Sequence, residues 1–181
     1  RLNQFYVKNW LFDRVDQEEV LEKFVQEVFK DGKPEVRGQW LDEKTNLGCT
    51  YAIDFLTFDR SMQIDLKTTR DSSAYAFSKL VERERYYLQD SMYSIGLEKV
   101  YGKKPKTRLW IAVENVAPYE CRVHYVDELY QEAGDWEFRK QMNNLKHCLE
   151  KNQWPQGQNV VESLDPSYFF KSYYEPRLNE V

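Results

Sequence analysis

Apolar and polar residues alternate with the two-residue period of a β-strand in two adjoining segments, residues 51–58 and 61–69. Both segments are rich in Ile, Phe, Thr and Tyr, and the polar pair at 59–60 separates them, so we predict an antiparallel hairpin. If that pair forms the loop, the numbers of paired residues sum to 119. Asp54 then lies directly opposite Asp65.

The alternation also predicts one charged and one apolar face for the hairpin. Asp65 and Lys67 share a face, because side chains two residues apart on a strand point the same way. The other face is predicted to take four apolar residues, Ile53, Phe55, Ile64 and Leu66. Opposed carboxylates repel by roughly 0.2 to 1 kcal/mol when exposed, and by more when desolvated. The pattern therefore predicts a divalent cation between Asp54 and Asp65.

Hydrophobic periodicity elsewhere predicts strands over 35–41, 107–113 and 120–126. It predicts helices over 16–30, from Ser72 or Ser73 to Val81, over 84–101, and after a capping Asp127. This order indicates an α/β (α+β) fold with a central mixed β-sheet flanked by helices. The last thirty residues mix Pro, Gly and aromatics. We expect them to pack on their own domain or on another subunit, with stacking on DNA as the alternative.

The predicted helix over 84–101 carries two stripes. Leu88, Met92 and Ile95 form an apolar stripe typical of a core face, whereas Tyr86, Gln89 and Tyr93 form a polar aromatic one. Such a polar stripe is either packing or a platform for a phosphate backbone or an unpaired base. Arg83 and Arg85 precede the helix and are candidate phosphate contacts.

Composition limits the alternatives. A chain of 181 residues is long enough for one domain over 1–181, and a formal charge of −4 argues against a globally basic nucleic-acid coat, although a local basic groove stays open. No apolar run approaches the ~18 residues of a membrane span, and no signal peptide is evident, so we expect a soluble cytoplasmic protein. Three distant cysteines, expected to be buried thiols, form neither a disulfide framework nor a zinc or iron–sulfur set.

An oxygen-only ligand set suits Mg²⁺ or Mn²⁺, with one or two ions held by Asp54 and Asp65. Lys67 lies one side chain further along the same face and would stand beside the metal as a charged donor. Glu35, at the start of the first predicted strand, is roughly level with Asp54. It is a candidate third acidic ligand, and the alternative is a solvent-facing residue at the sheet edge.

An Asp, ten residues and then Asp-x-Lys, at Asp54, Asp65 and Lys67, resembles the motif of the PD-(D/E)XK nuclease superfamily. The strand end IDLKTT, followed by a helix containing YxxQDSMY, resembles the RecE-type exonucleases (exonuclease VIII-like) and, more distantly, RecB-like nuclease domains. The likeness runs from about Glu35 through Trp154 and Pro155. It implies a restriction-endonuclease-like fold.

The resemblance also implies roles for residues. Those matching Asp54 and Asp65 bind metal, and the one matching Lys67 orients or activates the attacking water and offsets transition-state charge. Gln89 and Tyr93 match an additional motif of a Gln and a Tyr four residues later, and Glu35 is the best match to an upstream acidic position. The family also uses a His on a more amino-terminal helix. This chain has His124 and His147, both downstream and interpreted as structural or surface residues, so we expect that ligand in missing upstream sequence.

The function implied is that of a Mg²⁺-dependent exodeoxyribonuclease that degrades linear double-stranded DNA from the 5′ end for recombination. The resemblance further implies a ring-like homo-oligomer that acts with a single-strand annealing protein in a bacterial or phage-encoded system. Two alternatives stay open. One is an endonuclease of the same fold with a restriction or repair role, and the other is a non-catalytic DNA-binding or scaffold protein.

Overall fold

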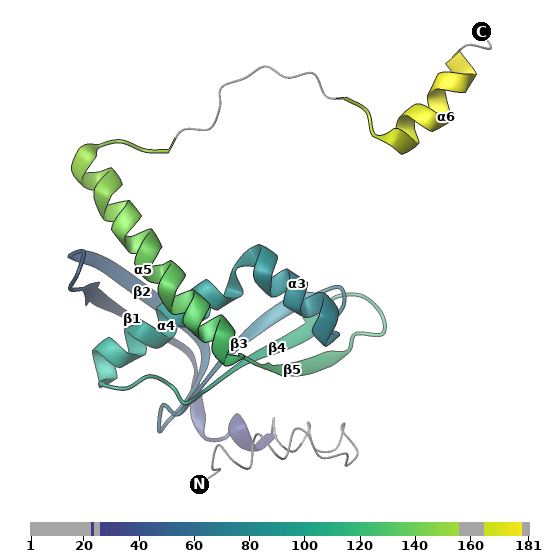
Figure 1. The fold of residues 1–181 in the computed structure, drawn as a ribbon. Coiled ribbons are helices and arrows are strands. Elements are labelled where there is room, and N and C mark those ends of the chain that lie inside the picture. The colour runs from purple at the N-terminus through teal and green to yellow at the C-terminus, as the bar shows by residue number, and fades with distance from the viewer. Residues whose placement is uncertain (1–22, 24–25, 156–164, 179–181) are drawn as a thin grey trace. The chain divides into compact units, whose positions relative to one another are not determined.

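The computed structural model describes residues 23, 26–155 and 165–178. Within these residues a five-stranded sheet has the order β1-β2-β3-β4-β5 (Figure 1). The strands are β1 Gly32–Asp42, β2 Leu47–Thr57, β3 Met62–Thr69, β4 Thr107–Glu114 and β5 Cys121–Tyr125. The helices are α3 Ala74–Glu84, α4 Tyr86–Tyr101, α5 Glu128–Lys151 and α6 Tyr168–Leu178.

The sheet is mixed, as the sequence predicted. Strands β1, β2 and β3 form an antiparallel meander, β3 and β4 are parallel, and β4 and β5 are antiparallel. Parallel neighbours require a crossover connection, and helices α3 and α4 supply it between β3 and β4. The predicted α/β fold with flanking helices is therefore confirmed.

The predicted hairpin register is also confirmed. Phe55 pairs with Ile64 and Leu56 with Gln63, so the residue numbers of both pairs sum to 119. The ladder does not continue to Asp54 and Asp65, so these two residues lie just beyond its last recorded pair.

The two faces of the sheet bury different sets of side chains. On one face, Leu109 and Ile111 of β4 pack with Val28, Phe55, Met62 and Ile64. On the other face, Trp110 and Ala112 pack against Phe77 and Val81 of helix α3. This alternation along β4 places Asp65 and Lys67 on the face that the helices cover, because each is paired in register with Trp110 or Ala112.

One predicted face is wrong. Phe55 and Ile64 pack together, but Ile53 packs with Trp40, Leu97 and Phe138 in the cluster beneath helices α4 and α5, and Leu66 is 51% exposed. The change of face falls at Asp54. Glu35, level with Asp54 in the β1–β2 register, has a left-handed φ of 52° and no recorded ladder pair. An irregular backbone there interrupts the strict alternation on which the prediction depended.

The helix ends follow local capping chemistry. Ser73 caps α3 by accepting a hydrogen bond from the Ala76 N–H at 3.4 Å, and the Asp127 carboxylate accepts one from the Leu129 N–H at 2.9 Å before α5. Gly102, with φ 80°, ends α4.

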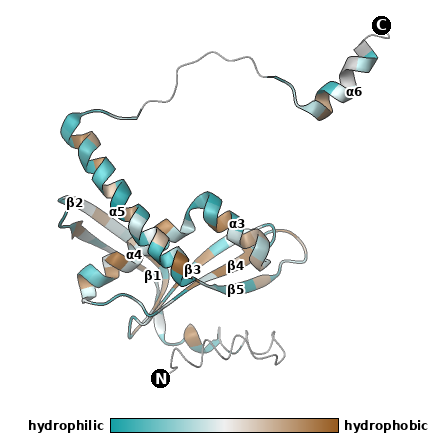
Figure 2. Cartoon of the chain, viewed as in Figure 1, coloured by the Kyte–Doolittle hydropathy of each residue, from teal (hydrophilic) through white to brown (hydrophobic). Residues whose placement is uncertain are grey.

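Helix α5 is hydrophilic over much of its length, with hydrophobic residues at intervals (Figure 2). Of the helix predicted over 16–30, residues 23 and 26–28 are helical, residues 29–30 form a turn, and the rest lies outside the described residues.

The chain divides into two compact units, Arg1–Lys151 and Asn152–Val181. One domain over 1–181 stays a prediction, and every described strand lies in the first unit. The second contains α6, which the sequence analysis did not predict and which exposes four aromatic residues, Tyr168, Phe169, Phe170 and Tyr173.

Of the free cysteines Cys49 is buried as expected, whereas Cys121 is exposed. Within the described ranges, none of the helices is long and apolar enough to span a membrane.

A buried ion pair joins the end of β1 to helix α5. Arg139 donates two hydrogen bonds, at 2.7 and 2.8 Å, to the carboxylate of Asp42. These hydrogen bonds lower the pKa of Asp42 to about 2. Because the folded pKa lies below the usual 3.8, the ionised carboxylate stabilises the fold above that pH. The stabilisation is lost as the pH falls through the folded pKa.

We therefore expect Asp42→Asn to lower the free energy of unfolding by about 2 kcal/mol at pH 7. Urea denaturation at a series of pH values measures the difference, which should shrink steadily as the pH falls from about 4 to below 2. A deficit that stays constant over that range would contradict the assigned ion pair.

Candidate functional site

The ammonium group of Lys67 is the centre of the candidate site. It forms an ion pair with Asp65, donates a hydrogen bond to Gln89 Oε1 at 2.7 Å, and lies 4.3 Å from the centre of the Tyr86 ring. The Lys67 side chain is 11% exposed. Strand β3 supplies Asp65 and Lys67, while helix α4 supplies Tyr86 and Gln89. Asp65, Tyr86 and Gln89, which the sequence suggested separately, thus all contact the Lys67 ammonium.

Gln89 and Tyr93 lie one turn apart on helix α4. The Gln89 amide nitrogen donates to the Tyr93 hydroxyl at 3.1 Å, while its oxygen accepts from Lys67. Each end of the amide therefore has its own partner, which fixes its orientation. Tyr86 and Gln89 of the predicted polar stripe contact Lys67 of β3, whereas Tyr93 packs on the core together with the predicted apolar stripe.

Asp54 is held by the backbone of the neighbouring strand. Its Oδ2 accepts a hydrogen bond from the Leu66 N–H at 2.7 Å. That N–H is available because no strand pair between β2 and β3 is recorded beyond Phe55 and Ile64. The Asp54 carboxylate also interacts with that of Asp65 and helps to raise the pKa of Asp65. The two carboxylates are therefore neighbours, as the register predicted.

Asp65 is buried, and burial is the main cause that raises its pKa above the ordinary value. The Lys67 ammonium opposes this effect and the Asp54 charge adds to it. Asp65 Oδ2 is fully buried and, within the part of the chain described, accepts no hydrogen bond beyond its ion pair with Lys67. Two adjacent carboxylates, whose mutual repulsion a cation would relieve, fit a hard divalent cation that takes oxygen ligands.

Glu35 does not join this pair. It is exposed, and its carboxylate accepts a hydrogen bond from Arg37 at 3.2 Å. Among the described residues, no group of three His, Cys, Asp or Glu side chains is placed to hold a metal ion. Glu35 as a third ligand stays a prediction that its placement does not support. His124 stacks on Phe77 with ring centres 4.8 Å apart, which agrees with a structural role.

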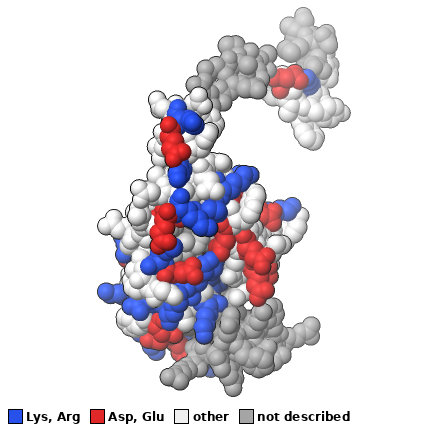
Figure 3. Space-filling model, turned by 60° about the vertical axis from the view of Figure 1, so that its left-hand side comes forward, with Lys and Arg blue, Asp and Glu red and all other residues white. Residues whose placement is uncertain are grey.

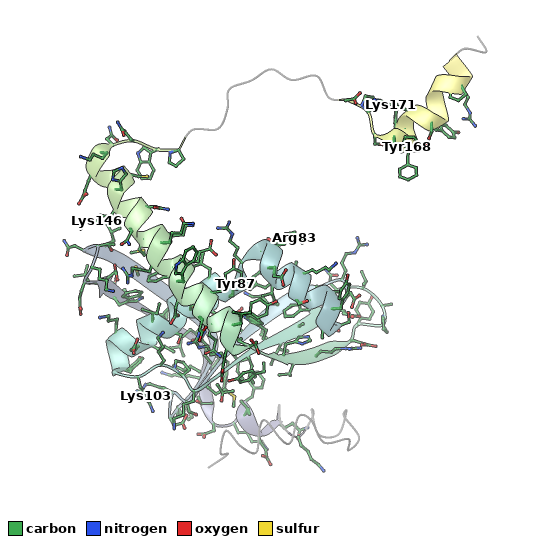
Figure 4. All side chains as sticks on the ribbon, in the orientation of Figure 1. Arg83, Tyr87, Lys103, Lys146, Tyr168 and Lys171 are labelled. Atoms are coloured by element: carbon green, nitrogen blue, oxygen red, sulfur yellow. The ribbon has the colours of Figure 1, made fainter. Side chains whose placement is uncertain are left out.

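The two arginines that the sequence suggested for DNA contact are engaged elsewhere. Arg83 pairs with Glu84 and Arg85 with Glu137, each at 2.8 Å. The Tyr87 hydroxyl also donates a hydrogen bond to the Glu137 carboxylate, which therefore links the start of α4 to α5. Arg83 and Tyr87 are labelled in Figure 4. On the face that Figure 3 displays, basic and acidic side chains are interspersed. Neither arginine touches the Lys67 cluster in a recorded contact.

Sequence reasoning missed a buried polar network next to this cluster. Asp90, beside Gln89 in α4, contacts Gln63 of β3 and Arg108 of β4. A signal was present, because Arg108 interrupts the apolar strand TRLWIAV, where an unpaired charge would be unfavourable. Its partner was not identifiable from spacing.

A mixed sheet that carries two carboxylates and a lysine on adjacent antiparallel strands, next to a helix with Gln and Tyr, defines a PD-(D/E)XK-type domain. Residues 2–165 match the family described as a PDDEXK-like domain of unknown function (DUF3799). The chain belongs to this family. The resemblance to PD-(D/E)XK nucleases inferred from the motif is therefore confirmed.

One solved structure with a TM-score above 0.5 supports the fold. A putative exonuclease from Eubacterium rectale is 14% identical over 96% of this chain and 73% of its own, with a TM-score of 0.54. An alkaline exonuclease from Laribacter hongkongensis is 15% identical over 76% of this chain and 72% of its own, with a TM-score of 0.30. No curated protein sequence matches significantly.

The raised pKa of Asp65 leads to a stability prediction for the metal-free protein. A folded pKa above the usual 3.8 means that the ionised carboxylate is less favourable in the fold than in the unfolded chain. The penalty therefore appears as the pH rises through the folded pKa. We expect Asp65→Asn to raise the midpoint of thermal unfolding by roughly 2 to 4 °C at pH 7.

Scanning calorimetry in a chelating buffer tests this expectation, and the gain should vanish below about pH 4. Asp42→Asn is the matched control, because the pKa of Asp42 is shifted in the opposite direction and that variant should lose stability at pH 7. A lower midpoint for Asp65→Asn than for the wild type at pH 7 would show that the Lys67 pair outweighs burial.

Proposed function

We propose that this protein is a metal-dependent deoxyribonuclease, and that it acts as an exonuclease on linear double-stranded DNA. The observation that carries the proposal is the Lys67 ammonium held between Asp65 of β3 and Gln89 of α4, with Asp54 beside it. Phosphodiester hydrolysis needs positive charge where negative charge develops, and this cluster offers it. Family membership supports the same chemistry.

Asp54 and Asp65 are the residues that would hold Mg²⁺ or Mn²⁺, as one or two ions. When bound, such an ion lowers the pKa of a coordinated water and polarises the scissile phosphate. Without it, the Asp65 carboxylate is buried next to a second negative charge, which is unfavourable. A bound cation would relieve this repulsion between the two carboxylates.

Lys67 would orient the attacking water and offset the charge that builds on the phosphate. Gln89 holds the ammonium through its amide oxygen, and Tyr93 holds the Gln89 amide nitrogen, so α4 sets the direction of the Lys67 side chain. Tyr86 contributes its ring face to the same ammonium. This contact assigns Tyr86 to holding Lys67 in addition to the DNA contact expected from its stripe.

Arg83 and Arg85 would contact DNA phosphates after exchanging their carboxylate partners for the substrate. Both side chains are more than half exposed, which permits the exchange. The resemblance to RecE-type enzymes further supports 5′-to-3′ polarity, a ring-like homo-oligomer, a single-strand annealing partner and a role in recombination in the cytoplasm. These parts of the proposal rest on that resemblance.

The first test removes the central charges. Asp65→Ala should abolish Mg²⁺-dependent degradation of linear DNA, and Lys67→Ala should slow it by at least about 100-fold, because each removes charge from the reacting centre. Circular dichroism should show that both variants keep the fold. Lys146→Ala, which removes a partly exposed lysine of α5, is the control and should leave the rate unchanged. Undiminished activity of Asp65→Ala would refute the proposal.

The form of the DNA separates the candidate activities in the same assay. An exonuclease degrades linear duplex and spares the closed circle, whereas an endonuclease of the same fold nicks or linearises the circle. A label at each strand end then reports the polarity.

Metal binding is the second test, and calorimetric titration of Mn²⁺ into metal-free protein measures it. We expect the wild type to bind and both Asp54→Ala and Asp65→Ala to lose binding, because each variant removes half of the carboxylate pair. A non-catalytic scaffold needs no such site, so absence of binding by the wild type would favour that alternative. Glu35→Ala should bind as the wild type does; a loss of binding would assign Glu35 as a third ligand.

A further inference from the structure

A buried charge network lies between helix α4 and the central strands. Arg108 donates to one carboxylate oxygen of Asp90 at 3.0 Å, and Gln63 donates to the other at 3.0 Å and to the Asp90 main-chain carbonyl at 3.3 Å. The side chains of Asp90 and Arg108 are 3% and 4% exposed. Both oxygens of the carboxylate are therefore bound from the sheet below the helix.

The network is adjacent in sequence to the candidate site on both elements. Asp90 follows Gln89 on α4, while Gln63 lies two residues before Asp65 on the same face of β3. Gln63 and Arg108 are register partners on parallel strands, so their side chains stand side by side. The contact between Gln89 and Lys67 and the network around Asp90 thus join the same helix to the same strand.

Apolar contacts also hold α4. Leu88, Met92 and Ile95 pack on the core, and a Cβ at Gly96 would meet the side chains of Trp40 and Tyr51 within 2.9 Å. These contacts set how closely the helix approaches the sheet, whereas the polar bonds of Asp90 act directly beside Gln89. A shift by one residue, ~1.5 Å along the axis, would break the 2.7 Å hydrogen bond between Gln89 and Lys67.

A buried ion pair is weak evidence for stability, because the loss of hydration offsets much of its attraction, and apolar replacements of both partners are often neutral or stabilising. The directional bonds from Gln63 and Arg108, in contrast, specify one height and one rotation of the helix. The network is therefore better suited to fixing geometry than to adding stability.

We propose that Asp90 and Arg108, with Gln63, are positioning residues that hold α4 at the height at which Gln89 meets Lys67. The proposal rests on the proposed nuclease function for its kinetic consequence, but its structural consequence is measurable in the metal-free protein. None of the three residues has to touch DNA or metal for this role.

Two variants separate positioning from plain stability. Asp90→Leu/Arg108→Met removes both charges and the directional bonds while filling the space, so it should stay folded with a thermal midpoint near that of the wild type. Its kcat should fall at least tenfold with little change in KM, because Lys67 loses its oriented partner.

Asp90→Asn should behave in the opposite way. An amide oxygen still accepts from Arg108, and Gln63, whose buried Oε1 has no hydrogen-bond partner within the described chain, can turn its amide to accept from the new amide group. The helix position is kept, so kcat should stay within about twofold of the wild type.

The side-chain amide signal of Gln89, followed by NMR in metal-free protein, gives a readout independent of activity. It should move toward the position of a free glutamine amide in the double variant and stay in place in Asp90→Asn. Asp42→Leu/Arg139→Met is the matched control, because it removes the ion pair between the end of β1 and helix α5 and should leave both the Gln89 signal and kcat unchanged.

An unchanged kcat and an unchanged Gln89 signal in the folded double variant would overturn the positioning role while leaving the nuclease function intact. So would a folded Asp90→Asn variant that is as slow as the double variant. If the wild type cleaves no DNA, the proposed function fails, and the Gln89 signal still decides the positioning role.

Discussion

The compensation of one largely buried ammonium group organises this molecule. Lys67 is only about one-tenth exposed, so its charge requires partners within the protein. Asp65 supplies the counter-charge, Gln89 a hydrogen-bond acceptor and Tyr86 a ring face. Gln89 and Tyr86 both lie on α4, so the helix reaches the Lys67 ammonium only if it crosses strand β3 at this position. The position of α4, and with it the crossover between β3 and β4, is tied to this contact.

The same cluster is unfavourable in isolation, as sites that act on charged substrates often are. Burial raises the pKa of Asp65, and the neighbouring Asp54 adds to the shift. Level with Asp54, Glu35 has a left-handed backbone, which is uncommon for a residue other than glycine. These features oppose stability and coincide with the proposed metal site. In contrast, the ion pair between Asp42 and Arg139 stabilises the fold well away from it.

Local sequence predicted the parts of the site that lie on single elements. The polar pair at 59–60, taken as the centre of the turn, and the alternation of β2 and β3 were enough to predict the register that brings Asp54 next to Asp65, although the loop itself has four residues, 58–61. The spacing of Tyr86, Gln89 and Tyr93 was enough to place them on one helix face. The prediction failed for Ile53, because the strand changes face at Asp54, level with the left-handed backbone of Glu35 on β1. It also failed to include α6, since the tail has no clear periodic pattern.

The sequence by itself therefore determined the five strands, helices α3, α4 and α5, the mixed sheet and the chemical identity of the charged face, because strand and helix periodicity act over a few residues. Only the tertiary structure decided that Gln89 reaches Lys67, that Asp90 binds Gln63 and Arg108, and that Glu35 stays apart from the carboxylate pair. Each of these depends on how a helix lies on a sheet or how a strand bends. Such distances are set by packing and charge compensation across the whole domain, and no local pattern encodes them.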